Sequence, residues 1–326
     1  MGSLSCCASF RFNHLNLKLT VKMNFKEAKN EILHILGKTE PQDLAKLIDW
    51  VTKSDDLDDY LVDNQKTILR SIADDLRPCL PLEAMFPSET MAIQKTQQNS
   101  KPTLHVDAFL YNEEVVDSLC EEGKMSRNYC LNCGSHRTAP LEFISHSFSI
   151  SELQFLFHHV LPDLTGKLVV DVGSRLGAVL YGGYVYSAAA RLVGVEISEE
   201  FVKLQTVTVE KYGFSDRIQV IHADICSQAA LVQNADVLIM NNVFEYFMEA
   251  RDQLRAWQFI SQNFLKKGAL LVTVPSIQEA LMSLQDTNGL SAIGHWLEEV
   301  PLDYSVYLKN DADPDSLKQI HLYRVL

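Results

Sequence analysis

In the C-terminal half of the chain, short apolar runs alternate with segments of helical periodicity. Five runs of four or five residues are too short for buried helices and predict strands over 168–172, 192–196, 218–222, 237–240 and 270–274. The segments between them predict helices over 178–191, 199–212 and 246–266. Strands buried on both faces and joined by helices predict a doubly wound, mostly parallel α/β sheet.

The alternation changes near the C-terminus. Residues 304–308 and 320–325 are predicted to be strands, and the segment between them contains Pro314 and no convincing crossover helix. Parallel strands need a long crossover connection. We therefore expect these two strands to form an antiparallel hairpin that completes the sheet.

The N-terminal half has a different organisation. Apolar residues at helical spacing predict three short helices within residues 24–73, and we interpret them as a helical cap without chemistry. Ser149 and Glu152 form a predicted capping box at the start of a helix over 150–160. We divide the chain into a disordered leader 1–23, a helical region 24–86, a linker 87–102, a connecting segment 103–148 and an α/β domain 149–326.

Composition narrows the class of protein. The 326 residues are 47% hydrophobic and 22% charged, which excludes disorder over the whole length, and the longest uncharged stretch is too polar to span a membrane. The formal net charge of −13 disfavours tight binding to nucleic acid. Seven scattered cysteines without a hydrophobic leader indicate reduced thiols and a cytoplasmic or nuclear protein.

The loop after the first predicted strand carries the most specific pattern. It runs from Asp171 through Gly173 to Gly177, a Gly-x-x-x-Gly spacing that lacks the dinucleotide fingerprint Gly-x-Gly-x-x-Gly. In a doubly wound sheet, ligands bind beyond the carboxyl ends of the strands, and glycines let a cofactor approach the backbone closely. We expect a nucleoside cofactor at this loop.

Acidic residues end the next two strands. Glu196 is placed to accept both hydroxyl hydrogens of a ribose, and Asp224, followed by Ile225, is placed to meet the exocyclic amine of an adenine. The alternative is that both acids are ordinary helix N-caps.

These residues and the terminal hairpin resemble the class I, seven-stranded, Rossmann-like S-adenosylmethionine-dependent methyltransferases. The resemblance implies that Gly173 and Gly177 flank the methionine part of S-adenosylmethionine, that Glu196 binds its ribose and that Asp224 with Ile225 holds its adenine. It also implies that Asp171 reaches the cofactor's ammonium group, directly or through water.

The sequence departs from the family at one position. The family's loop is commonly Gly-x-Gly-x-Gly, and Arg175 replaces the middle glycine. If that backbone needs a positive φ, a side chain costs roughly 1 kcal/mol or more, and cofactor binding is weakened. The alternative is that Arg175 points outward and binding is retained.

The segment after the fourth strand supplies the candidate catalytic residues. Asn241 and Asn242 resemble the pair in Dot-type histone lysine methyltransferases, whereas 243–245 equally resembles the type 11 methyltransferases of small molecules. Family members place residues here beside the transferable methyl group, so Asn241 is also predicted to contact the cofactor. The asparagines are predicted to orient the acceptor, and Glu245 to act as a base; the alternatives are a turn with a helix cap and a solvated acid in the first helical turn.

Two further features remain open. Cys130, Cys133 and His136 could hold zinc together with Cys120 or His146, but a second regular ligand pair is missing, so no metal site is predicted. One interpretation of residues 143–149 is a lid over the cofactor or the acceptor. The alternative is that His146 and Ser147 only form hydrogen bonds with backbone groups of the loop.

We therefore predict an S-adenosylmethionine-dependent methyltransferase with an unidentified acceptor and no membrane partner. The acidic charge favours a basic protein side chain, from lysine or histidine, over a small molecule. The alternative function is a catalytically inactive methyltransferase-fold protein that regulates or scaffolds partners.

Overall fold

The computed structural model describes residues 25–53, 56–96, 102–132, 136–284, 295–307 and 314–326. The chain divides into two compact units, Met1–Gln65 and Lys66–Leu326. Each unit is described by itself. Among the described residues, none of the helices has the length and apolar character needed to cross a membrane.

The first unit is helical, as predicted. It holds α1 (Phe25–Lys38), α2 (Pro41–Lys53) and the start of α3 (Asp56–Leu76). Pro41 occupies the first position of α2, where the missing N–H group costs no hydrogen bond.

The second unit is built on a seven-stranded sheet of order β10-β11-β9-β8-β5-β6-β7. Its parallel part consists of β5 (Leu168–Val172), β6 (Arg191–Glu196), β7 (Ile218–His222), β8 (Val237–Asn241) and β9 (Leu270–Val274). The five predicted strands are therefore confirmed. Strand order reverses between β5 and β8, and in sheets of this kind the ligand crevice lies at such a switch point.

The terminal hairpin is antiparallel, but its first strand was predicted wrongly. It pairs β10 (Leu297–Val300) with β11 (His321–Val325), and β11 also pairs antiparallel with β9. Residues Tyr304–Tyr307 form a 3-10 helix instead of a strand. The cause is local, because a carboxylate oxygen of Asp303 accepts hydrogen bonds from the backbone N–H and the hydroxyl of Ser305 and starts a tight turn.

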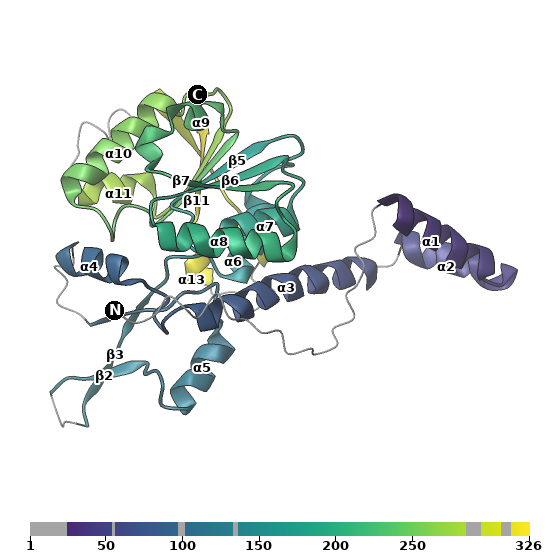
Figure 1. Ribbon diagram of the computed structural model, residues 1–326, viewed down its shortest axis with the longest axis horizontal. Coiled ribbons are helices and arrows are strands. Elements are labelled where there is room, and N and C mark those ends of the chain that lie inside the picture. Colours follow the sequence, from purple (N-terminus) through teal and green to yellow (C-terminus); the bar gives the residue numbers. More distant parts are fainter. Residues whose placement is uncertain (1–24, 54–55, 97–101, 133–135, 285–294, 308–313) are drawn as a thin grey trace. The chain divides into compact units, whose positions relative to one another are not determined.

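Alternate residues of each strand pack on opposite faces of the sheet. Val169 and Ile239 face α6 (Ile150–Phe155), α7 (Ala178–Tyr186) and α8 (Glu199–Tyr212). Val170 and Leu238 face the opposite layer of helices: α9 (Ala229–Asn234), α10 (Ala250–Asn263) and α11 (Ile277–Ser283) (Figure 1). Helix α8 has its predicted bounds, whereas α7 and α10 are shorter than predicted.

The connecting segments complete the second unit. Strand β1 (Thr103–His105) pairs parallel with β4 (Glu142–Ile144), and β2 (Asn128–Cys130) pairs antiparallel with β3 (Thr138–Pro140). Helix α5 (Glu113–Glu121) lies between β1 and β2 in the chain. Residues Pro87–Thr96, within the expected linker, form helix α4. Ser149 and Glu152 make the predicted capping box, and the helix that they start ends in a π-turn over Leu156–Val160.

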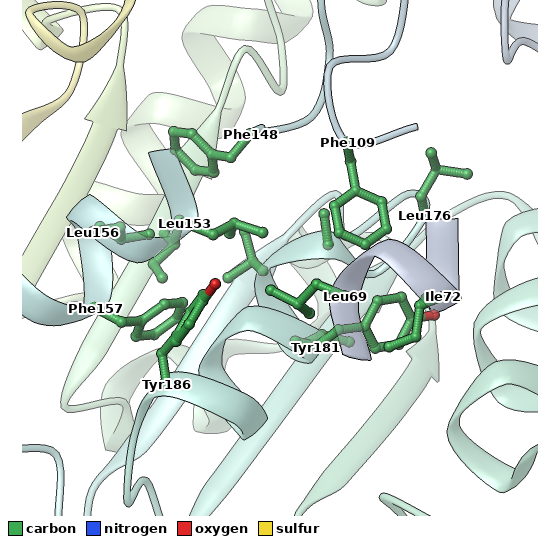
Figure 2. Close-up of a cluster of buried hydrophobic side chains, with 14 of the residues drawn as sticks. Leu69, Ile72, Phe109, Phe148, Leu153, Leu156, Phe157, Leu176, Tyr181 and Tyr186 are labelled. Atoms are coloured by element: carbon green, nitrogen blue, oxygen red, sulfur yellow. The ribbon is translucent and has the colours of Figure 1, made fainter. Parts of the chain in front are cut away.

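These connecting segments share one buried core with the sheet. Leu69 and Ile72 of α3 and Phe109 pack around Tyr181 of α7, and Phe148 joins Leu153 of α6 (Figure 2). Each fully buried side chain of this size contributes roughly 1.5–3 kcal/mol. The N-terminal part of the second unit is thus held against the sheet by apolar burial.

Candidate functional site

The loop between β5 and α7 is anchored on the neighbouring strand. The carbonyl oxygen of Val195 accepts hydrogen bonds from the backbone N–H groups of Gly173 (2.8 Å) and Ser174 (3.2 Å). Gly173, Arg175 and Gly177 all have positive φ angles, of 67°, 44° and 84°. The position of Arg175 is therefore a left-handed one that favours glycine.

The side chain of Arg175 does not point outward, so of the two alternatives the structure shows the one with a positive φ. Its guanidinium lies 2.7 Å from an oxygen of Glu89 and 2.6 Å from an oxygen of Asp107, and it donates to the carbonyl of Ala84 at 2.5 Å. The side chains of Arg175, Glu89 and Asp107 are 8%, 11% and 1% exposed. Burial lowers the pKa of Arg175, but the two carboxylates outweigh burial and raise it. We call these four residues the Arg175 clasp; it fastens α4 and the chain after β1 to the loop.

Glu196, at the end of β6, is tied to the same loop. One carboxylate oxygen accepts the backbone N–H of Arg175 and the other accepts that of Ser198, each at 2.8 Å. Each oxygen can accept a second hydrogen bond, so the group retains capacity for the two hydroxyls of a ribose. Burial raises the pKa of Glu196, and the hydrogen bonds partly oppose this.

Asp171 lies in β5 and is 4% exposed. Burial raises the pKa of its carboxyl well above the usual range, and the nearby charge of Glu196 adds to the shift. Asp171 does not border the cavity described below, so direct contact with a cofactor there would require rearrangement.

Asp224 and Ile225 follow β7. Asp224 is the N-cap of a 3-10 turn over Ile225–Ser227, and its carboxylate accepts the backbone N–H of Cys226 at 2.8 Å. The N-cap alternative therefore holds for Asp224, although its carboxylate is exposed and reaches the cavity. Ile225 is buried beside it and supplies an apolar wall.

Asn241 and Asn242 follow β8. The amide of Asn242 donates to the side-chain oxygen of Asn241 at 3.2 Å, and its backbone N–H donates to Val274 at 2.7 Å. Asn242 has a positive φ of 48°, which asparagine tolerates better than most residues. Glu245 precedes α10, and a carboxylate oxygen accepts the N–H of Phe244 at 3.2 Å; burial raises its pKa.

One cavity of about 570 Å³ collects most of the predicted residues. Its size is typical of small-molecule sites. It is bordered by six of the nine predicted site residues: Gly173, Glu196, Asp224, Ile225, Asn241 and Asn242. Asp171, Gly177 and Glu245 are not among its wall residues. Helix α4 contributes Ser88, Glu89 and Ala92, and His146 closes a further part of the wall.

The sequence reasoning missed a histidine pair at this wall. Nδ1 of His105 lies 2.9 Å from Nε2 of His146, and the two ring planes are inclined by only 14°, with centroids 5.1 Å apart. The rings of Tyr246 and Phe247 flank His146, with centroids 5.2 and 4.9 Å from its own. Burial, then Arg175 and then His105 lower the pKa of His146 to about 2. No local signal marks the pair, because the pairing of β1 with β4 brings the two histidines together across 41 positions.

The cysteine segment is separate from the cavity. Cys130 is exposed on β2 and its thiol lies 2.5 Å from the carbonyl oxygen of Asn132; His136 is also exposed, and Cys133 lies outside the described residues. Within the described part of the chain, no group of three His, Cys, Asp or Glu side chains is arranged to hold a metal ion.

Comparison with known proteins finds a methyltransferase domain in this chain. Residues 170–273 match the family model of a methyltransferase domain, of type 11. No curated protein matches the chain.

Solved structures with a similar fold include a methyltransferase from Geobacter sulfurreducens, with 20% identity over 54% of this chain and 78% of that one, at a TM-score of 0.35. An RNA methyltransferase from Salinibacter ruber in complex with S-adenosyl-L-homocysteine has 16% identity over 54% and 88% of the chains, at a TM-score of 0.34. An O-methyltransferase from Bacillus cereus in complex with SAH has 12% identity over 56% and 84%, at a TM-score of 0.39.

The sheet topology and the matched segment define a methyltransferase domain in a Rossmann-like α/β fold. The predicted fold class is confirmed by the sheet topology. The match to a methyltransferase domain supports the predicted enzyme class and, with it, S-adenosylmethionine as the cofactor. The resemblance to type 11 methyltransferases is supported, whereas the one to the Dot-type enzymes remains an expectation.

Proposed function

We propose that the 570 Å³ cavity binds S-adenosylmethionine and transfers its methyl group to a protein side chain. In this proposal Gly173 lies against the methionine part, Glu196 holds the ribose, Asp224 and Ile225 face the adenine, and Asn241 lies near the methyl group. The observation that carries the proposal is that residues from the ends of four strands, predicted separately, border one cavity.

The wall of the cavity fits this cofactor at two points. A Cβ atom at position 173 would lie 3.1 Å from the side chain of Val243. Glycine avoids this close contact and leaves the loop backbone accessible where a ligand must approach it. Glu196 is held rigidly by two backbone N–H groups and keeps acceptor capacity for two hydroxyls.

When bound, the cofactor supplies a methyl group on a positively charged sulfur. The residues of the chain need to hold the acceptor in line with that carbon at near-attack distance. Asn241 and Asn242 are proposed to orient the acceptor by accepting its hydrogen bonds. Glu245 does not border the cavity and has no part in this proposal.

We favour a lysine or histidine side chain of a basic protein as the acceptor. Glu199 and Glu200 are exposed at the border of the cavity, and the whole chain carries a formal charge of −13. Acidic groups around a binding site attract a basic segment and raise its rate of association. The composition of the chain further favours action in the cytoplasm or nucleus.

Calorimetry of cofactor binding tests the site. Glu196→Ala removes both acceptor atoms for the ribose, and we expect affinity for S-adenosylmethionine to fall about 10- to 100-fold, since hydrogen bonds to a charged group contribute about 1.5–3 kcal/mol. Glu210→Ala is the matched control on exposed α8 surface and should bind as the wild type does. Equal affinity of Glu196→Ala and wild type, or no heat at millimolar cofactor, would refute the proposed site.

Label transfer tests the reaction. Wild-type protein is incubated with methyl-labelled cofactor and cell extract, and the labelled products are identified by mass spectrometry. Labelled protein side chains support the proposal. Label confined to small molecules overturns the proposed acceptor class, and cofactor binding without any transfer favours the inactive regulatory alternative.

A further inference from the structure

The two helices of the first unit leave apolar side chains uncovered. In the described part of the chain, fourteen large hydrophobic side chains are exposed; six of them lie between residues 32 and 51, and the other eight are scattered through the second unit. The six are Ile32, Leu33, Ile35, Ile48, Trp50 and Val51. Single exposed apolar side chains are normal, whereas a group of them marks a surface that binds a partner.

These side chains follow helical spacing. Apolar residues of α2 recur from Leu44 to Val51 in steps of three, one and three residues, which places them in one stripe. Ile32 and Ile35 lie three residues apart in α1 and share a face of that helix. Only two residues separate α1 from α2, and a connection of this length joins antiparallel helices into a hairpin. We call residues 25–53 the α1–α2 hairpin.

The α1–α2 hairpin does not bury a core of its own. No side chain of residues 29–52 is buried, and Leu36, Leu44 and Leu47 are only half-buried. Helices of 14 and 13 residues are marginal in water when they are isolated. The helices of this hairpin therefore need further apolar contacts to be stable.

Three devices usually stabilise chains of fewer than about 40 residues: a disulfide, a metal ion or association. The α1–α2 hairpin contains no cysteine. No group of three metal-ligating side chains occurs among the described residues. Association is the device that remains.

The charges of the α1–α2 hairpin restrict the partner. The hairpin contains five lysines and five acidic residues, so its formal net charge is zero, whereas the whole chain carries −13. This balance gives no preference for a basic or an acidic partner, and helices that lie on membranes have a polar face rich in Lys and Arg. Two copies of a balanced surface approach each other without net repulsion, whereas the acidic remainder of the chain repels its own copy.

We propose that the α1–α2 hairpin is a dimerisation surface that binds the same hairpin of a second copy of this chain. The apolar stripes of the two hairpins then cover each other in a four-helix arrangement. Two-fold dimers are the commonest soluble assemblies, and such an interface uses the same patch on both copies. The proposal concerns the first unit alone and does not depend on the proposed methyl transfer.

Sedimentation velocity of the full chain, at about 1 to 100 μM, tests the dimer. Wild type should sediment as a dimer within this range. Ile48→Asp places two carboxylates in the apolar interface, one from each copy, and should weaken association about 100-fold or more. Ile35→Asp does the same from α1. Gln42→Asp makes a similar change on the opposite, exposed face of α2 and is the matched control, which should dimerise as the wild type does.

Hydrogen exchange locates the interface and shows that the variant folds. In the wild-type dimer, backbone amides of α1 and α2 should be protected, and in Ile48→Asp they should exchange faster because the covering copy is lost. Amides of the seven-stranded sheet should exchange equally in both proteins. Equal exchange of the α1 and α2 amides in wild-type dimer and Ile48→Asp would place the interface elsewhere and overturn the proposal.

The sedimentation outcomes are equally decisive. A dimer that Ile48→Asp and Ile35→Asp dissociate and Gln42→Asp does not supports the proposal. A wild type that stays monomeric at about 100 μM overturns it, whether another protein or the chain itself then covers the hairpin. A dimer that neither isoleucine variant weakens also overturns it, because the two copies then associate through another face.

Discussion

Arg175 occupies a backbone position that favours glycine, and the contacts of its side chain compensate for the strain. A non-glycine residue in the left-handed region costs roughly 1–2 kcal/mol. The Arg175 clasp pairs the guanidinium with two carboxylates and a carbonyl in a buried setting, while the backbone N–H of the same residue holds Glu196. Arg175 thus links α4 and the chain after β1 to Glu196, the residue predicted to bind the ribose.

Arg175→Ala leaves the carboxylates of Glu89 and Asp107 buried without their cation. Removing one partner of a buried pair costs about 3–5 kcal/mol of unfolding free energy, which urea titration measures. Arg175→Gly should recover about 1 kcal/mol of that loss because it relieves the backbone. Arg127→Ala breaks an exposed pair with Glu113 and Asp117 and should cost about 0–1 kcal/mol. A loss below 1 kcal/mol for Arg175→Ala would show that the clasp contributes little.

Residues of the candidate site were predictable where a strand end fixes them. Gly173, Glu196 and Asn241 each end or follow an apolar run. Parallel pairing of these strands is enough to predict that the three residues lie close together. Glu89, Asp107 and the histidine pair were not predictable, because their contacts depend on how α4, β1 and β4 pack, and no periodicity encodes that packing.

At the scale of elements, the turn into α7 constrains the loop from the opposite side. Gly177 is the N-cap of α7 with φ 84°, and a Cβ there would lie 2.7 Å from the ring of Tyr181, which is fully buried. The predicted cofactor role of Gly177 thus has a structural reason beside it: the glycine lets the helix start above a packed aromatic ring.

Two glycine variants separate backbone strain from collision. Gly177→Ala should lower the unfolding free energy by about 2–4 kcal/mol, since it adds overpacking against Tyr181 to the left-handed strain. Gly268→Ala has a similar φ of 78° with nothing within 4 Å of its Cβ, so we expect about 1–2 kcal/mol from strain alone. Equal losses in urea titration would contradict the collision.

For the whole molecule, the parallel sheet was predictable because each strand is a short apolar run. Such a run must be covered on both faces, and a parallel sheet between two layers of helices covers it. The hairpin was predicted with the wrong first strand, since an apolar pattern at 304–308 was overridden by the Asp303 turn. Helix α4 was expected to be linker because its sequence is polar; its place in the structure comes from the Arg175 clasp, a tertiary interaction.

The stability of the whole molecule should depend on the buried histidine pair. Burial, then Arg175 and then His105 lower the pKa of His146 to about 2 in the folded chain, against roughly 6.5 when unfolded. As the pH falls below 6.5, the histidine is protonated in the unfolded chain but stays neutral in the folded chain. The free energy of unfolding therefore keeps its full value above pH 6.5 and decreases toward low pH. Asp171, whose pKa is raised by burial, has the opposite dependence, so a variant difference is needed.

Urea titrations of wild type and His146→Gln at pH 7.5 and pH 5 provide that difference. Each pH unit below 6.5 costs about 1.4 kcal/mol for one buried neutral histidine, so wild type should lose about 2 kcal/mol more than His146→Gln between these values. His34→Gln, exposed on α1, should follow wild type. If His146→Gln also follows wild type, His146 accepts protons as freely in the folded chain as in the unfolded one, which would contradict its desolvation beside Arg175.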